Sequence, residues 1–245
     1  MIKYYFTCIL LVTSLMAEVQ TSYYKSGGVR LQQELENGKA EGLTRGFYED
    51  GTLFFETEYV NGMASGISRE YNKNGELATV KEYLSGKKTA EVSFKNGKKN
   101  GWFRQYNLNG TVKLEKEYRN NLLNGITQSY YENGNLHVKM NMKSGVLHGI
   151  SEEYFDNKVL KTETSYKNGL VDGIVKHFSE DGKLEAQLFY VKDKKNGTAL
   201  FYDKSDKIQH EIIFSDDMVV KGYAYGKTGE KKIMTYKEVK QIGFK

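Results

Sequence analysis

Residues 125–148 read GITQSYYENGNLHVKMNMKSGVLH, and the pattern in this stretch recurs along the chain. A glycine opens it, Tyr130 follows five positions later, Asn-Gly comes next, and Leu136 lies two positions beyond that glycine. The opening glycine returns after 24 residues at most steps. A fixed period of about 20–50 residues is typical of repeat proteins. The opening glycines are Gly42, Gly66, Gly101, Gly125, Gly149, Gly173 and Gly197.

Each repeat predicts two strands joined by a turn. Apolar and polar residues alternate on both sides of Asn133 and Gly134, and a strand places alternate residues on opposite faces. A two-residue turn would place Tyr130 opposite His137, among charged residues. A three-residue loop places it opposite Leu136. The pattern therefore predicts a type I turn whose glycine takes the left-handed conformation and forms a bulge.

The alternation also predicts one aromatic face and one charged face. Leu136, Val138 and Met140 share the first of these faces, and we expect Tyr130 beside them. The other face carries residues such as Glu115. The predicted fold class is therefore all-β, an elongated single-layer antiparallel array of about nine β-hairpins of ~24 residues each.

The chain divides into four kinds of segment. Residues 1–17 combine a basic residue, an apolar run and Ala17, which predicts a secretory signal peptide. Repeats fill residues 18–221. An irregular insertion at about 87–97 looks like a single added strand, because the step from Gly66 to Gly101 is 35 residues. Residues 222–245 form a degenerate, basic C-terminal cap repeat.

Cysteine and charge narrow the setting. The chain has 245 residues, no Pro and one cysteine, Cys8, inside the predicted signal peptide. The mature chain therefore has no disulfide, and strand pairing and aromatic packing must stabilise it. The formal net charge is +5, and residues 222–245 hold six Lys and two Glu. The repeats are close to neutral, which argues against nucleic acid as a partner.

The recurring pattern Gly-x4-Tyr-x2-Asn-Gly-x-Leu-x5-Tyr-x-Asn-Gly-x3-Gly resembles the MORN repeat, in its bacterial variant MORN-2. Gly42–Gly66, Gly101–Gly125 and Gly149–Gly173 match it well, and the resemblance covers nearly all of residues 20–221. It implies an elongated, twisted antiparallel sheet of stacked hairpins, a MORN-like solenoid. Some relatives are labelled antitoxins, and others look like surface adhesins or envelope interaction proteins.

The residues that enzymes use are scattered. His137, His148, His177 and His210 fall in separate repeats, without the local spacing of a metal site. Adjacent carboxylates such as Glu152 and Glu153 point to opposite faces of a strand and do not form an acid–base pair. We therefore predict no enzyme activity, no catalytic residues, no metal and no cofactor.

Two sets of residues form the candidate binding surface. One is a column of aromatic residues at equivalent positions. The other occupies a variable position two residues earlier in each repeat, and we place it on the aromatic face. The aromatic column is Phe47, Tyr71, Tyr106, Tyr130, Tyr154, Phe178 and Tyr202. The variable set is Arg45, Arg69, Arg104, Gln128, Glu152, Lys176 and Leu200.

We expect an exported, non-catalytic repeat protein in the periplasm, on the cell surface or in the medium. Its extended sheet would bind a protein partner or a cell-surface ligand, as an envelope interaction protein or an adhesin does. One alternative is an antitoxin or immunity-type protein that neutralises a toxin. Another is a membrane-associated scaffold that touches anionic lipid weakly through its Lys-rich C-terminus.

Overall fold

The computed structural model describes residues 18–242, so the predicted signal peptide at 1–17 lies outside the described residues. The described chain holds 21 strands and one short helix, and every strand pairing that defines the sheet is antiparallel. The predicted all-β hairpin array is confirmed. The chain divides into two units after Lys87, and each unit is described by itself.

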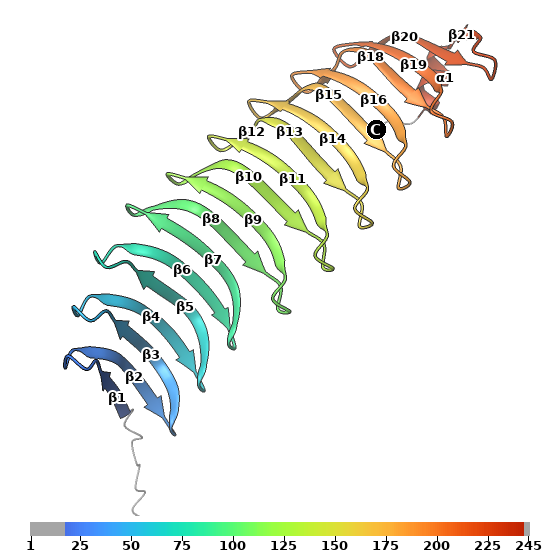
Figure 1. The fold of residues 1–245 in the computed structure, drawn as a ribbon. Helices are drawn as coiled ribbons and strands as arrows, with labels where there is room; N and C mark the ends of the chain where they lie inside the picture. Colours follow the sequence, from blue (N-terminus) through green and yellow to red (C-terminus); the bar gives the residue numbers. More distant parts are fainter. Residues whose placement is uncertain (1–17, 243–245) are drawn as a thin grey trace, which may run out of the picture. The chain divides into compact units, whose positions relative to one another are not determined.

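In the first unit each strand pairs with the next along the chain (Figure 1). Its strands are β1 (Glu18–Tyr23), β2 (Val29–Glu36), β3 (Lys39–Phe47), β4 (Leu53–Val60), β5 (Met63–Tyr71) and β6 (Leu77–Leu84).

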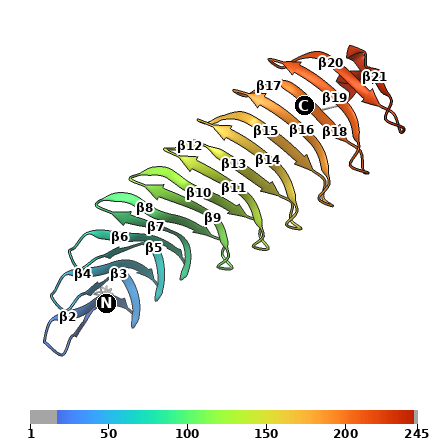
Figure 2. The ribbon, with the colours of Figure 1, turned by 45° about the horizontal axis from the view of Figure 1, so that its top comes forward.

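The second unit repeats this meander (Figure 2). Its strands are β7 (Lys87–Lys95), β8 (Lys98–Tyr106), β9 (Val112–Arg119), β10 (Leu122–Tyr130), β11 (Leu136–Lys143), β12 (Val146–Leu147), β13 (Gly149–Tyr154), β14 (Leu160–Lys167), β15 (Leu170–Phe178), β16 (Leu184–Val191), β17 (Lys194–Lys195), β18 (Gly197–Tyr202), β19 (Ile208–Ser215), β20 (Met218–Tyr225) and β21 (Lys231–Ile233). The helix α1 (Tyr236–Gln241) follows.

The longer turns have the predicted geometry. The Gly134 N–H donates to the Tyr131 carbonyl at 2.9 Å, and Gly134 has a φ of 85°. Tyr130 pairs with Leu136, as the three-residue loop requires. Lys158 and Asp206 replace this glycine in two repeats and keep a positive φ, of 71° and 59°.

The second kind of turn has two residues. Asn168 and Gly169 both have positive φ, which is the type I′ conformation that matches the twist of paired strands. The two kinds of turn alternate along the chain except at β7, which has a two-residue turn at each end. The predicted single-strand insertion at about 87–97 is therefore confirmed.

The two-residue turns are joined by backbone hydrogen bonds along their edge of the sheet. In the second unit, the Gly145 N–H donates to the Leu123 carbonyl at 2.8 Å, and the Gly169 N–H donates to the Leu147 carbonyl at 2.8 Å. Each bond joins a turn to the one before it, 22 residues earlier in the chain. Donors that a free turn would expose to water are thus satisfied within the repeat array.

The 24-residue glycine permits a close backbone contact. Three residues of β10, 124–126, lie between Leu123 and Thr127 where β9 has only Glu117. Gly125 in this bulge has a φ of 122°, and the Glu117 carboxylate occupies the place of its missing Cβ. Glu117 Oε2 also accepts from the Ile126 N–H at 3.2 Å. Only glycine combines this conformation with so near a neighbour.

The prediction of one aromatic face and one charged face is wrong. The register shifts by one residue between the Ser129–Val138 pair and the Tyr130–Leu136 pair, which leaves His137 as the extra residue of a bulge. Tyr130 therefore lies on the face opposite Val138. Its hydroxyl donates to Glu115 Oε2 at 2.8 Å, which places the first aromatic column on the charged face. We call this face the ladder face.

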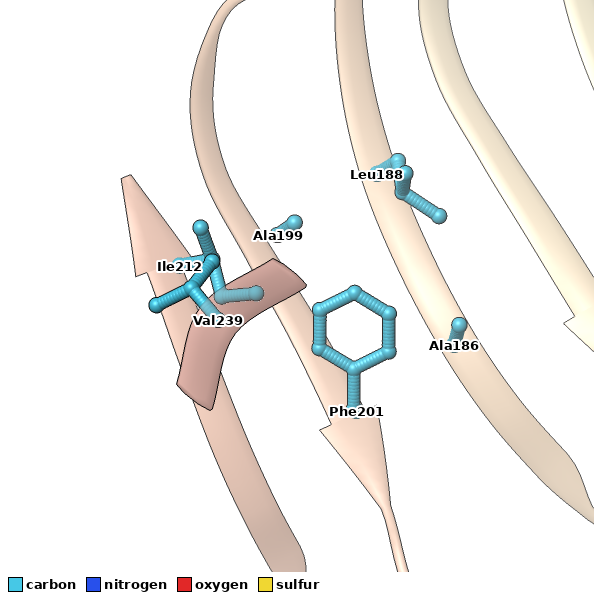
Figure 3. Close-up of a cluster of buried hydrophobic side chains, with 6 residues drawn as sticks. All are labelled: Ala186, Leu188, Ala199, Phe201, Ile212 and Val239. Atoms are coloured by element: carbon cyan, nitrogen blue, oxygen red, sulfur yellow. The ribbon is translucent and has the colours of Figure 1, made fainter. Parts of the chain in front are cut away.

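The opposite face, which we call the helix face, carries the only compact core among the described residues (Figure 3). The second aromatic column lies here, and its members Tyr190 and Phe214 pack against this core. Elsewhere in the described chain no large side chain is fully buried. The core residues are Ala186, Leu188, Ala199, Phe201, Ile212 and Val239.

The helix α1 was not predicted from the sequence. It begins after Thr235, whose Oγ1 accepts from the Glu238 N–H at 3.4 Å, while Glu238 Oε2 accepts from the Thr235 N–H at 2.6 Å. This reciprocal capping box stabilises short helices. A Cβ on Gly222 would lie 2.6 Å from Val239 Cγ2, so this glycine lets the helix approach the sheet.

Candidate binding surfaces

The seven variable positions form part of one row across the ladder face, which we call the central row. Each residue in the row lies directly opposite the next on the neighbouring strand. In the first unit the row runs Gln32, Arg45, Glu56, Arg69, Val80. In the second it runs Glu91, Arg104, Glu115, Gln128, Lys139, Glu152, Glu163, Lys176, Gln187, Leu200, Glu211.

Arginines in the central row lie between or beside carboxylates. In the first unit Glu56 accepts ion pairs from Arg45 at 3.9 Å and Arg69 at 3.4 Å. In the second unit Arg104 contacts Glu115 at 2.7 Å and Glu91 at 3.6 Å. These pairs neutralise the arginines that we expected to select a partner.

The remaining variable positions are also engaged or apolar. Lys176 contacts Glu163 at 2.8 Å, and Glu152 contacts Lys139 at 3.2 Å. Gln128 Oε1 accepts from the Tyr130 hydroxyl at 3.2 Å. Leu200 is a half-buried apolar residue. The row therefore holds neighbouring strands together, and its charges are satisfied within the sheet.

Tyrosines of the aromatic column donate to the carboxylates of the central row. Tyr71 donates to Glu56 Oε1 at 3.2 Å, and Tyr106 donates to Glu91. Burial, followed by the hydrogen bond and charge of Glu115, raises the pKa of Tyr130 to about 12. Phe47, Tyr154, Phe178 and Tyr202 occupy the equivalent half-buried positions, each paired with an aliphatic residue across the turn.

Glu91 is the most heavily bonded carboxylate of the row. Burial acts to raise its pKa, but hydrogen bonds from Lys88 and Tyr106 and the charges of Lys88 and Arg104 outweigh burial and lower it. Lys88 Nζ lies 2.7 Å from Glu91 Oε2. Glu91 is therefore ionised in the folded protein at neutral pH, as a structural ion-pair network requires.

A different arrangement of charge occurs along the two-residue turns of the second unit. Between β7 and β15, the residues that flank these turns include five cations, and within the described residues none of the five has an ion-pair partner. We call this surface the basic edge. Its cations are Lys95, Lys98, Arg119, Lys143 and Lys167.

Exposed aliphatic residues lie directly opposite three of these cations. Leu122 pairs with Arg119, Val146 with Lys143, and Leu170 with Lys167. These three aliphatic residues are 52%, 44% and 39% exposed. Equivalent turns lie two strands apart, which is roughly 10 Å in a sheet. The basic edge thus offers apolar contact and positive charge at a regular interval.

Sequence reasoning missed the basic edge. Its signal is present in the tetrapeptides 119–122, 143–146 and 167–170, which read RNNL, KSGV and KNGL. Each has a cation before the turn and an aliphatic residue after it. Attention to the aromatic positions and to the residues two places earlier drew the analysis away from the turn edge, where strand alternation gives no guidance.

Two cavities flank α1 on the helix face. One, of 420 Å³, is lined mainly by apolar residues of β16, β18, β19, β20 and α1, with Lys195 and Lys240 among them. The other, of 640 Å³, contains Glu185, His210 and Glu238. Burial lowers the pKa of His210. The two cavities therefore differ in polarity and in the sign of their charged residues.

The described residues lack two further kinds of site. No three His, Cys, Asp or Glu side chains within 18–242 gather closely enough to hold a metal ion. A helix with the length and apolar character needed to cross a membrane does not occur in that range either. The segment 222–228, which we compared with a phosphate-binding loop, lies in the strand and turn that lead to β21.

This architecture defines an antiparallel β-hairpin repeat protein. Four segments match the MORN repeat variant family, at residues 40–61, 123–144, 147–168 and 171–192. The chain therefore contains MORN repeats of this variant, as the sequence pattern indicated, and such repeats suggest a protein involved in binding.

Other comparisons add little. No curated protein matches the chain. Similar solved structures include those described as "Crystal Structure of TcdB2-TccC3" and "Crystal Structure of TcdB2-TccC3-Cdc42", each 10% identical. They cover 84% and 88% of this chain, with TM-scores of 0.21 and 0.19. The chain spans only 15% of either protein.

Proposed function

We propose that this protein is an exported, non-catalytic binding scaffold whose basic edge docks an acidic segment of a protein partner. The observation that carries the proposal is the contrast between satisfied and unsatisfied cations. Arg104 in the central row contacts two carboxylates, whereas Arg119 on the basic edge contacts none within the described residues. Free cations in register are available to a partner's carboxylates without first breaking an existing ion pair.

The aliphatic residues of the edge support a protein partner. Leu122, Val146 and Leu170 are exposed beside the cations, and burying exposed apolar area contributes favourably to association. Charge complementarity would set the rate and specificity of the encounter. An acidic segment that also carries apolar side chains fits both features. Export rests on the sequence of residues 1–17.

Affinity capture tests the proposal. The protein is immobilised and exposed to envelope and cytoplasmic fractions, and the bound partner is identified. The triple variant Arg119→Gln, Lys143→Gln and Lys167→Gln should lose most of the captured partner, about tenfold or more in affinity, because each charge pair at an interface contributes of order 1 kcal/mol or more.

A matched control removes the same charge elsewhere. Lys73, Lys113 and Lys158 lie in or beside the longer turns and have no ion-pair partner among the described residues. Their triple replacement by Gln should leave capture unchanged. Equal losses in both triple variants would show that only net charge matters and would contradict the proposal. Capture solely from cytoplasm would favour the antitoxin-type alternative.

A further inference from the structure

We propose that the apolar groove beside α1 binds an anionic amphiphile, a single alkyl chain with one negatively charged head group. The groove has a volume of 420 Å³, within the range of about 300–1,000 Å³ that is usual for small-molecule sites. Its floor comes from the helix face of the sheet and its wall from α1 (Figure 3). This site is separate from the basic edge.

The lining of the groove suits an alkyl chain. Leu188 and Ile212 belong to the buried core beneath the helix, and Val219 continues the apolar surface toward the turn. Phe201 and Phe214 add aromatic area. A largely apolar lining with a few polar groups is typical of sites that bind small organic ligands.

Two lysines give the groove its sign. Lys195 Nζ lies 5.7 Å from the centre of the Phe214 ring, and Lys240 Nζ lies 4.8 Å from that of Tyr236. Within the described residues neither lysine forms an ion pair. Both ammonium groups therefore rest on aromatic rings that line the groove. A carboxylate or sulfonate placed there would gain two charge-assisted contacts.

The neighbouring cavity strengthens the choice of ligand. The cavity on the other side of α1 contains Glu185 and Glu238, which would repel an anion, although Lys232 also lines it. A chain of mixed character, apolar along its length and negative at one end, fits only the groove that holds Lys195 and Lys240. A neutral alkyl chain would use the apolar lining but would leave both lysines without an anion.

Isothermal titration calorimetry with monomeric decanoate tests the proposal on the purified protein. Decanoate should bind, and 1-decanol should bind at least tenfold more weakly. The double variant Lys195→Gln and Lys240→Gln should reduce decanoate affinity about tenfold or more and leave decanol binding unchanged. The double variant Lys194→Gln and Lys237→Gln is the control, because these residues adjoin the same elements but do not line the groove.

A second variant blocks the groove. Val219→Trp should abolish binding of both probes while circular dichroism reports an unchanged fold. If this variant unfolds, the lysine double variant still decides the matter. Three results would overturn the proposal: no binding of decanoate, equal affinity for decanoate and decanol, or binding that the Lys195 and Lys240 replacements do not reduce. Sedimentation with anionic vesicles in the absence of decanoate binding would assign the lysines to a membrane surface instead.

Discussion

The central row and the basic edge of the second unit use the same residue types for different ends. Arg104 lies between Glu91 and Glu115 in the middle of a face, where neighbouring strands supply a carboxylate on each side. Arg119 lies at a turn, where its pairing partner is Leu122. Strand register therefore decides whether a cation stabilises the fold or stays available for binding.

The largest effect is expected from Gly125→Ala, which strikes the bulge beside the central row. Alanine would be forced to a φ of 122° and into the Glu117 carboxylate. We expect a loss of about 3 kcal/mol in unfolding free energy, the upper range for a strained residue. Urea unfolding measures it.

The matched control is Gly134→Ala, where φ is 85° and nothing lies within 4 Å of the added Cβ. It should cost only about 1–2 kcal/mol, the penalty of the left-handed backbone alone. Equal costs at the two glycines would mean that the glutamate contact adds nothing.

The next effect separates the two kinds of arginine directly. Arg104→Gln removes the cation from two carboxylates, so we expect a loss of about 1–2 kcal/mol in unfolding free energy. Arg119→Gln should change it by less than about 0.5 kcal/mol, as at most surface positions. Thermal unfolding of both variants gives the comparison, and similar shifts would remove the distinction between row and edge.

Alkaline pH should weaken the ladder face. The pKa of Tyr130 is raised from 10.0 to about 12, so the folded state holds this proton more tightly than the unfolded chain does. Its contribution is complete below pH 10 and is lost as pH rises toward 12. Unfolding free energies measured in urea at pH 9 and 11.5 should fall more in the wild type than in Tyr130→Phe.

Acid pH should act on the same row from the other side. The folded-state pKa of Glu91 lies below its ordinary value of 4.5, so the stability that it contributes is present above that pH and declines as pH falls through the folded pKa. Glu91→Gln should flatten the pH dependence of unfolding below about pH 5. A profile parallel to the wild type would show that Glu91 does not contribute to it.

The smallest expected effect is that of salt on stability after the basic edge is neutralised. Replacement of Arg119, Lys143 and Lys167 by Gln should leave the melting temperature nearly unchanged, while removing most of the salt dependence of partner capture. A large fall in melting temperature would show that these cations stabilise the fold after all.

The repeating turns and strands were predictable because they depend on local rules. Glycine at a left-handed position and alternation on either side of it define a hairpin from a few residues. The faces were mispredicted because a one-residue bulge between Ser129 and Tyr130 reverses the alternation, and no residue type announces it. A single slip in register moves a side chain to the other face.

The helix and the binding surfaces were missed for other reasons. The segment 235–241 has a capping box but only six helical residues, too few for a recognisable apolar period. The groove depends on packing between β20 and α1, which no local pattern encodes. The expected roles of Arg45, Arg69 and Arg104 ignored their neighbours across the strands, which supply the compensating carboxylates.

The hydrogen bonds between successive two-residue turns set a rule for the length of this protein. Each turn donates to a carbonyl 22 residues earlier and offers an identical acceptor to the turn that follows. Removing or duplicating 24 residues within the regular repeats returns every donor to an equivalent acceptor, whereas 23 would leave the whole edge out of step. Genes that encode such a chain can therefore lengthen or shorten it in whole steps without redesigning the joint.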